Sequence, residues 1–271
     1  MNFSLIYGSL ALYLASFAAY TWFLYDSRRW VGRAASACLA LGILVHYLAL
    51  LERSRWVHSV PYQDLYGSMS LFAWLLAVTY LGLESFHRQR SVGPFVVPFV
   101  IFWVVAAMAI APAGPPSPPP ARGPLFALHV TLNILAYSSF ALSFILSLIY
   151  LVQNRMLRLR RPGLAFWRFP ALDVLERMSR SSVWVGLVSL GFGAALGFIW
   201  EHRITGHYGF ADPKVMITLA ILAVYAGYLW LAHSAAGRGA RAARVCACNF
   251  VIVLFSYTVV NLYLTHFHRY F

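Results

Sequence analysis

Long apolar segments constrain the fold of this sequence more than any other feature. A bilayer core about 30 Å thick is crossed by roughly 20 apolar residues in a helix. Charged residues make up only 11% of the chain, whereas a soluble domain carries about 25%. The sequence therefore predicts an all-α, polytopic integral membrane protein with eight transmembrane helices. The expected spans are residues 3–25, 34–51, 66–86, 92–110, 125–152, 182–202, 213–233 and 246–266.

The distribution of basic residues predicts the orientation of these spans. Lys and Arg accumulate in the short cytoplasmic loops of membrane proteins. Fifteen of the 21 basic residues follow the first, third, fifth and seventh spans, and six lie on the other side. This split predicts both termini on the outer face of the membrane. It also assigns the net charge of +13 to topology and to contact with anionic lipid headgroups, not to nucleic acid.

The chain is expected to form a single membrane domain over residues 1–271, with the first span retained and not cleaved as a signal peptide. The longest connection is residues 153–181, a cytoplasmic basic loop with room for a short amphipathic helix around Leu172–Arg180. The Pro-rich stretch from Ala111 to Pro124 is expected to be an extended outer loop, because proline disrupts helices.

Several kinds of chemistry are missing from the sequence. The three cysteines form no C-x-x-C pair and no C-x-x-C-H site, which argues against a thiol oxidoreductase or a c-type cytochrome. No Walker, G-x-S-x-G or H-E-x-x-H sequence occurs. None of the eight acidic residues is centred in an expected span, which argues against a proton-coupled transporter.

The histidines gather toward the outer side. His129 begins the fifth span, and His266 and His268 end the eighth. Any one of them is more often an interfacial or hydrogen-bonded residue than a ligand. Several at one depth from separate helices, however, are what a haem or metal site requires. His46, within the second span, is expected to form a structural hydrogen bond in preference to ligating a second haem.

Four segments, in order along the chain, carry a family resemblance. One reads Gly193-x-x-x-Gly197-x-x-Trp200, Gly206-x-Tyr208 and Asp212-Pro213-Lys214. An earlier one runs from Val60-Pro61-Tyr62 to Ser68-Met69. The others are the fifth span, from His129 to Gln153, and the closing stretch from Val260-Asn261-Leu262 to His268-x-Tyr270. Together they resemble the tryptophan-rich segment and its flanking helices in the cytochrome c assembly protein family, the CcsA/ResC-type membrane haem handlers. The core of the resemblance covers about residues 60–271.

The resemblance implies a haem-binding protein of cytochrome c biogenesis in a bacterial-type inner (plasma) membrane. In that family two histidines hold haem at the outer (periplasmic) face, where it is delivered to apocytochrome c. Carried over, the axial ligands of the haem iron are His129 and His268, with Trp200, Tyr208 and Asp212 as further cofactor-binding residues and haem b as the cofactor. His266 and His207 are fallback ligands. The implied partners are membrane lipid, haem, apocytochrome c and a membrane subunit with a periplasmic domain.

The sequence also departs from the family pattern. Thr205, Gly209 and Ala211 stand where the family has later tryptophans, and Gly67 replaces a glutamate. A haem-ligase activity is therefore left open, and no catalytic residue is assigned. The alternative is a non-catalytic, HemX-like membrane subunit or scaffold that keeps the fold and anchors partners.

Overall fold

α-Helix is the only regular secondary structure in the part of the chain that the computed structural model describes, residues 3–57, 60–62, 64–111, 123–160, 169–207, 213–234 and 237–259. The predicted all-α class is confirmed. The helices are α1 (Ser4–Tyr25), α2 (Arg29–Val57), α3 (Leu65–His87), α4 (Gly93–Ala109), α5 (Gly123–Arg158), α6 (Leu172–Thr205), α7 (Pro213–His233) and α8 (Ala240–Val259).

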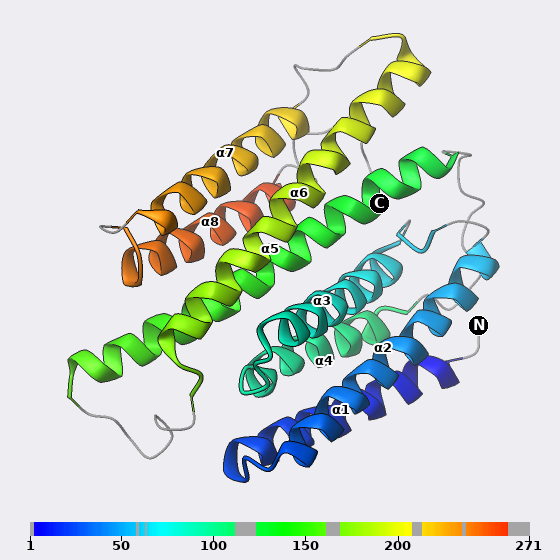
Figure 1. Ribbon diagram of the computed structural model, residues 1–271. Coiled ribbons are helices and arrows are strands. Elements are labelled where there is room, and N and C mark those ends of the chain that lie inside the picture. Colours follow the sequence, from blue (N-terminus) through cyan, green and yellow to red (C-terminus); the bar gives the residue numbers. More distant parts are fainter. Residues whose placement is uncertain are drawn as a thin grey trace.

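The helices form two four-helix bundles that lie side by side (Figure 1). In the first bundle α1 packs on α2 and α4, and α3 packs on α2 and α4. In the second, α5 packs on α6 and α8, and α7 packs on α6 and α8. The bundles meet mainly where α3 packs against α5. One buried apolar cluster joins α1–α4 to parts of α5 and α6, and a second lies among α5–α8. The remaining space between the bundles is bordered by helices from both.

Six helices are long and apolar enough to cross a membrane: α1, α2, α3, α5, α6 and, from Lys214 onward, α7. Helix α4 is also apolar but has 17 residues, at the lower limit of what a membrane span needs. Helix α8 does not meet the same test over its described residues. It stays a prediction that α4 and α8 cross the membrane and that both termini lie on its outer side.

The ends of α5 and α6 extend farther than the apolar segments that predicted them. Residues 153–158 continue α5, and α6 already begins at Leu172, so both ends of the expected 153–181 loop are helical. The predicted short helix around Leu172–Arg180 is the first part of α6 and not a separate element. Arginine side chains permit this extension, because their apolar stems lie along the helix while their guanidinium groups reach water.

Buried polar side chains link helices within the first bundle. The Glu84 carboxylate accepts hydrogen bonds from the hydroxyl groups of Tyr20, Tyr80 and Ser36. The Arg90 guanidinium lies 3.6 Å from the same carboxylate. The Glu84 side chain is only 3% exposed, so the bonds satisfy a charge that would otherwise be costly to bury.

The second bundle has a smaller buried polar cluster. The Ser179 hydroxyl lies 2.8 Å from the Ser143 hydroxyl and 3.1 Å from the Tyr228 hydroxyl. The Cys246 sulfur lies 2.8 Å from the Ser143 hydroxyl. These contacts join α5, α6, α7 and α8 at one level. Such interhelical hydrogen bonds help to hold helices together where water is absent.

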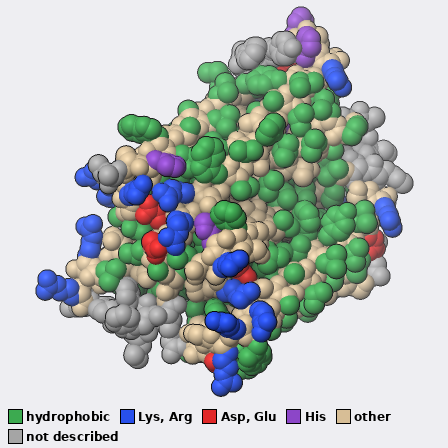
Figure 2. Space-filling model, in the orientation of Figure 1, with side chains coloured by type: hydrophobic (Ala, Val, Ile, Leu, Met, Phe, Trp, Pro, Cys, Tyr) green, Lys and Arg blue, Asp and Glu red, His purple; other side chains and the backbone are tan. Residues whose placement is uncertain are grey.

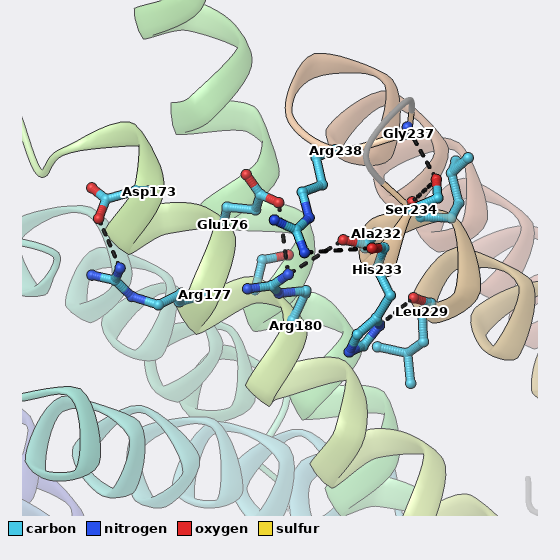
Figure 3. Close-up of polar contacts among 12 residues, drawn as sticks. Asp173, Glu176, Arg177, Arg180, Leu229, Ala232, His233, Ser234, Gly237 and Arg238 are labelled. Carbon is cyan, nitrogen blue, oxygen red and sulfur yellow. Dashed lines mark hydrogen bonds and ion pairs between the residues drawn. The ribbon is translucent and has the colours of Figure 1, made fainter.

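The two ends of the molecule differ in charge. At one end, here called the arginine end, Arg180 donates to the Ala232 carbonyl and Arg238 to the His233 carbonyl, at the last turn of α7 (Figure 3). These cations satisfy carbonyl groups that have no partner within the helix. Figure 2 shows most of the Lys and Arg side chains of the visible face along one margin and hydrophobic side chains over much of the rest. The opposite end, which carries His129 and Trp200, is here called the histidine end.

Candidate functional site

A large apolar cavity lies between the two bundles and reaches the histidine end. Its volume is about 980 Å³, at the upper limit of typical ligand pockets. Side chains from α3, α4, α5, α6, α7 and α8 all line it. Among them are Leu65, Met69 and Phe72 of α3, Phe99 and Trp103 of α4, His129, Ile134 and Phe144 of α5, Trp200 of α6, Ile217 of α7 and Phe250 of α8.

His129 contributes an imidazole ring to the wall of this cavity. Its Nδ1 lies 2.6 Å from the carbonyl oxygen of Gly193 on α6. A carbonyl oxygen only accepts hydrogen bonds, so Nδ1 carries the proton and donates it. The neutral ring then has its lone pair on Nε2, which is the form in which histidine binds metals. Gly193 thus selects the tautomer of His129 and orients its ring.

Two glycines on α6 make room for this histidine. They form the G-x-x-x-G pattern in the sequence and lie one turn apart on α6. Gly193 faces the Asn133 side chain, and Gly197 faces the His129 ring. A β-carbon at Gly197 would lie 2.5 Å from Cε1 of His129. Small residues at this spacing let two helices approach closely. The motif therefore shapes the site by bringing α5 and α6 together at His129.

Asn133, one turn after His129 on α5, contacts the same ring. Its Nδ2 lies 3.2 Å from Nε2 and 3.3 Å from Nδ1 of His129. The Asn133 Oδ1 atom is buried and has no hydrogen-bond partner. Because Nδ1 donates to Gly193, only Nε2 can accept a hydrogen bond from the Asn133 amide. A metal at Nε2 would replace that bond.

An aromatic cluster closes the cavity beside His129. The Phe126 ring lies 4.5 Å from the Trp200 ring, 5.7 Å from the Tyr62 ring and 5.9 Å from the His129 ring, between centroids. The residues come from α5, α6 and the segment before α3. Trp200, predicted to bind a cofactor, therefore lies in the wall of the same cavity as His129.

Charged side chains also line the cavity at this end. Glu201 follows Trp200 on α6, and Lys214 lies in the first turn of α7. The charges are confined to this end, and the lining residues farther from it are apolar except for the hydroxyl of Tyr137 and the indole N–H of Trp103. The cavity therefore has a polar margin at the histidine end and a hydrocarbon interior, which suits an amphipathic ligand.

The segment before α3 is held in place by a buried ion pair. The Arg53 guanidinium, 2% exposed, donates to the Asp64 carboxylate and lies over the rings of Trp56 and Tyr66. The other carboxylate oxygen of Asp64 accepts the Gly67 backbone N–H at 2.8 Å, an N-cap for α3. A β-carbon at Gly67 would lie 2.4 Å from the Pro61 carbonyl oxygen and 2.9 Å from that Asp64 oxygen, which explains why glycine fits at this position.

The other described histidines lie away from the cavity lining. Both ring nitrogens of buried His46 have partners, with Nδ1 3.1 Å from the Tyr13 hydroxyl and Nε2 2.9 Å from the Ser70 hydroxyl. His87 and His233 lie toward the arginine end and bond to Ser181 and to the Leu229 carbonyl. His202 and His207 are exposed at the histidine end.

Four of the residues singled out from the sequence fall outside the described residues: Tyr208, Asp212, His266 and His268. Nothing in the structure tests their predicted roles. The structure does bring His129 and Trp200 to one cavity. Sequence reasoning missed Asn133 and Phe126, although their one-turn spacing from His129 on a predicted helix was a signal that could have found them.

The fold and the cavity define a class: a polytopic all-helical membrane protein with an apolar pocket at one end and a histidine in its wall. Comparison with known proteins then identifies the family. The model of the family described as "Cytochrome C assembly protein" matches residues 62–268. The chain belongs to this family, as the four sequence segments predicted.

Individual relatives fall into two groups. Protein HemX of Brevibacillus brevis is 32% identical over 129 residues, 48% of this chain and 47% of that protein. Protein HemX of Bacillus subtilis (strain 168) is 28% identical, over 53% of this chain and 52% of that protein. Cytochrome c biogenesis protein CcsA of Synechococcus sp. (strain CC9902) is 27% identical over 90% of this chain and 88% of its own length. The match thus spans about half of the two HemX proteins and most of this CcsA protein.

Proposed function

We propose that this protein acts in cytochrome c biogenesis by holding haem at the outer, periplasmic face of a bacterial-type plasma membrane for delivery to apocytochrome c. His129 supplies one axial ligand of the haem iron and His268 the other. Family membership and the similarity to CcsA proteins over most of the chain support the role in cytochrome c biogenesis. Haem binding, the histidine pair and the orientation are the parts that the proposal adds.

The observation that carries the proposal is the state of His129. Its Nδ1 proton is held by the Gly193 carbonyl, and its ring lines the large cavity. A histidine that ligates a metal usually donates its other ring N–H to an acceptor in this manner, which fixes the ring and raises its basicity. His129 therefore has the tautomer and the support of an axial ligand.

The residues around His129 also fit a flat, largely apolar macrocycle. Val130, Ile134, Phe198 and Ile217 present hydrocarbon surface along the cavity. Lys214 lines its polar margin, where a cation can pair with a carboxylate side chain of the haem. Haem b, which has no covalent link to its protein, suits a protein that passes the cofactor on. Trp200, Tyr208 and Asp212 are the further residues that we propose to contact it.

When bound, the haem supplies vinyl groups that form thioether bonds with the thiols of an apocytochrome C-x-x-C-H sequence. The residues of this chain bind and orient the group. His129 sets the position of the iron through a ring fixed on Gly193, and the apolar walls exclude water. We propose that a partner membrane subunit with a periplasmic domain and the apocytochrome meet the protein at the histidine end.

A second candidate function is a HemX-like membrane subunit that keeps the fold and anchors partners without joining haem to protein. Two observations favour it. Thr205, Gly209 and Ala211 replace family tryptophans, so the aromatic platform is reduced mainly to Trp200. HemX of Brevibacillus brevis is 32% identical to this chain, across about half the length of each protein.

A visible absorption spectrum of the purified protein in detergent distinguishes these functions. A Soret band with low-spin b-type features is expected for the haem protein, and a colourless protein that stays so after haem is added would favour the scaffold. His129→Ala and His268→Ala, tested singly, should abolish or convert the low-spin spectrum, and added imidazole should restore it. A spectrum unchanged in both variants would show that this pair does not hold haem.

A further inference from the structure

The cavity continues well beyond the level of His129. Its lining on α5 runs from His129 to Ile145, a helical rise of about 24 Å. The far part, here called the inner arm, is lined by Leu76, Trp103, Ala141, Phe144, Ile145 and Phe250. Haem held by His129 would occupy the part of the cavity nearest the histidine end. The inner arm needs a separate explanation.

The inner arm is continuous with an exposed apolar surface between α4 and α8. Phe99 and Phe102 of α4 and Leu254 of α8 line the cavity, yet their side chains are 41%, 60% and 47% exposed. Over the described residues, α4 and α8 are not among the helix pairs that pack extensively on one another. The cavity is therefore open sideways, toward the region that acyl chains occupy around a membrane protein.

The chemistry of the inner arm restricts what can fill it. The only polar side-chain atom among its six residues is the indole N–H of Trp103. Water in a cavity needs two to four polar partners, and apolar cavities stay dry. The cost of leaving an apolar space empty rises with its volume, because the lining side chains lose packing contacts on one side. A hydrocarbon ligand is the remaining occupant.

We propose that the inner arm is a lipid-binding site that takes an acyl chain of a membrane phospholipid through the opening between α4 and α8. The chain packs against Phe144 and Phe250 in the second bundle and against Trp103 in the first, and it fills the gap between bundles that otherwise meet mainly through α3 and α5. A ligand that enters the cavity beside His129 meets this lipid at its inner boundary.

Native mass spectrometry of the full-length protein, released from vesicles of defined phosphatidylglycerol and phosphatidylethanolamine, tests the site. The wild type should retain a single tightly held phospholipid. Ala141→Phe, which fills the inner arm, should lose it, whereas Leu148→Phe should keep it, because Leu148 is on the same helix but outside the cavity lining. A wild type without retained phospholipid, or one that after purification from native membranes holds an isoprenoid instead, would overturn the proposal.

The fluorescence of Trp103 provides a second measurement. The emission of Trp103 is obtained by subtracting the fluorescence of the Trp103→Phe variant from that of the wild type. Phospholipids brominated at the middle of the acyl chain should quench this emission, and Ala141→Phe should reduce the quenching if that variant elutes as a folded monodisperse protein. Trp103 emission that brominated chains leave unchanged would contradict the proposal. Neither measurement involves haem, so failure here leaves the haem proposal standing, and the reverse also holds.

Discussion

The imidazole of His129 lies against Gly197, one turn from the Gly193 carbonyl that accepts its Nδ1 proton. A β-carbon at Gly197 would come within 2.6 Å of Nδ1 and 2.5 Å of Cε1. The backbone of α6 therefore both orients this ring and limits its approach. The family's paired glycines have a direct role in presenting the histidine, in addition to helix packing.

Gly197→Ala should displace the His129 ring and weaken haem binding. Overpacking of this kind costs about 1–3 kcal/mol, so we expect haem affinity to fall roughly tenfold or more. Gly191→Ala is the matched control, because Gly191 is on the same helix and a β-carbon there has no neighbour within 4 Å. Titration with haem, followed by absorbance at the Soret band, measures the haem affinity of both variants. Equal affinities in the two variants would show that Gly197 does not position the ring.

His46→Ala should destabilise the protein without lowering its haem content. The His46 ring is fully buried and both of its nitrogens lie within hydrogen-bond distance of hydroxyl groups, those of Tyr13 and Ser70. Removing it leaves a cavity and two unpaired hydroxyl groups, at a cost of about 2–4 kcal/mol. A pyridine haemochrome assay on the folded variant measures haem content. Loss of a haem equivalent would instead make His46 a ligand.

Glu84→Ala should cost much more stability than Tyr20→Phe. The first change removes the acceptor for three hydroxyl groups and the partner of Arg90, which we expect to cost about 3–5 kcal/mol. The second removes one donor while the other bonds to Glu84 remain, for about 1 kcal/mol. Thermal unfolding followed by size-exclusion fluorescence gives the order. Their double variant should be little worse than Glu84→Ala alone, since the bond is then already lost.

Reporter fusions should give opposite compartment signals at Arg161 and at Ala113. The positive-inside rule places the first position in the cytoplasm and the second outside. The expectation rests on the distribution of basic residues, fifteen on one side and six on the other. Alkaline phosphatase activity at Ala113 and green fluorescence at Arg161 are the expected outcome. The same compartment for both would overturn the orientation and the assignment of the histidine end to the outer face.

Much of the architecture was predictable because apolar length and charge placement act locally along the chain. The eight predicted segments all correspond to described helices, and most of their boundaries differ by a few residues. The larger differences, at α2, α5, α6 and the start of α8, arise because a helix continues past the last apolar residue where arginine side chains can reach water. Residues 260–266 of the last predicted span lie outside the described residues. Motif order along the chain was also enough to predict the family.

The sequence by itself determined the helices, the family and the choice of His129, because each depends on residue type and spacing within one segment. Only the tertiary structure decided that Gly193, Asn133 and Trp200 surround this ring, that hydroxyl groups occupy both nitrogens of His46, and that a cavity lies between the bundles. These relationships depend on the angle and depth at which separate helices cross. Packing between whole surfaces sets that geometry, and no single segment of the sequence specifies it.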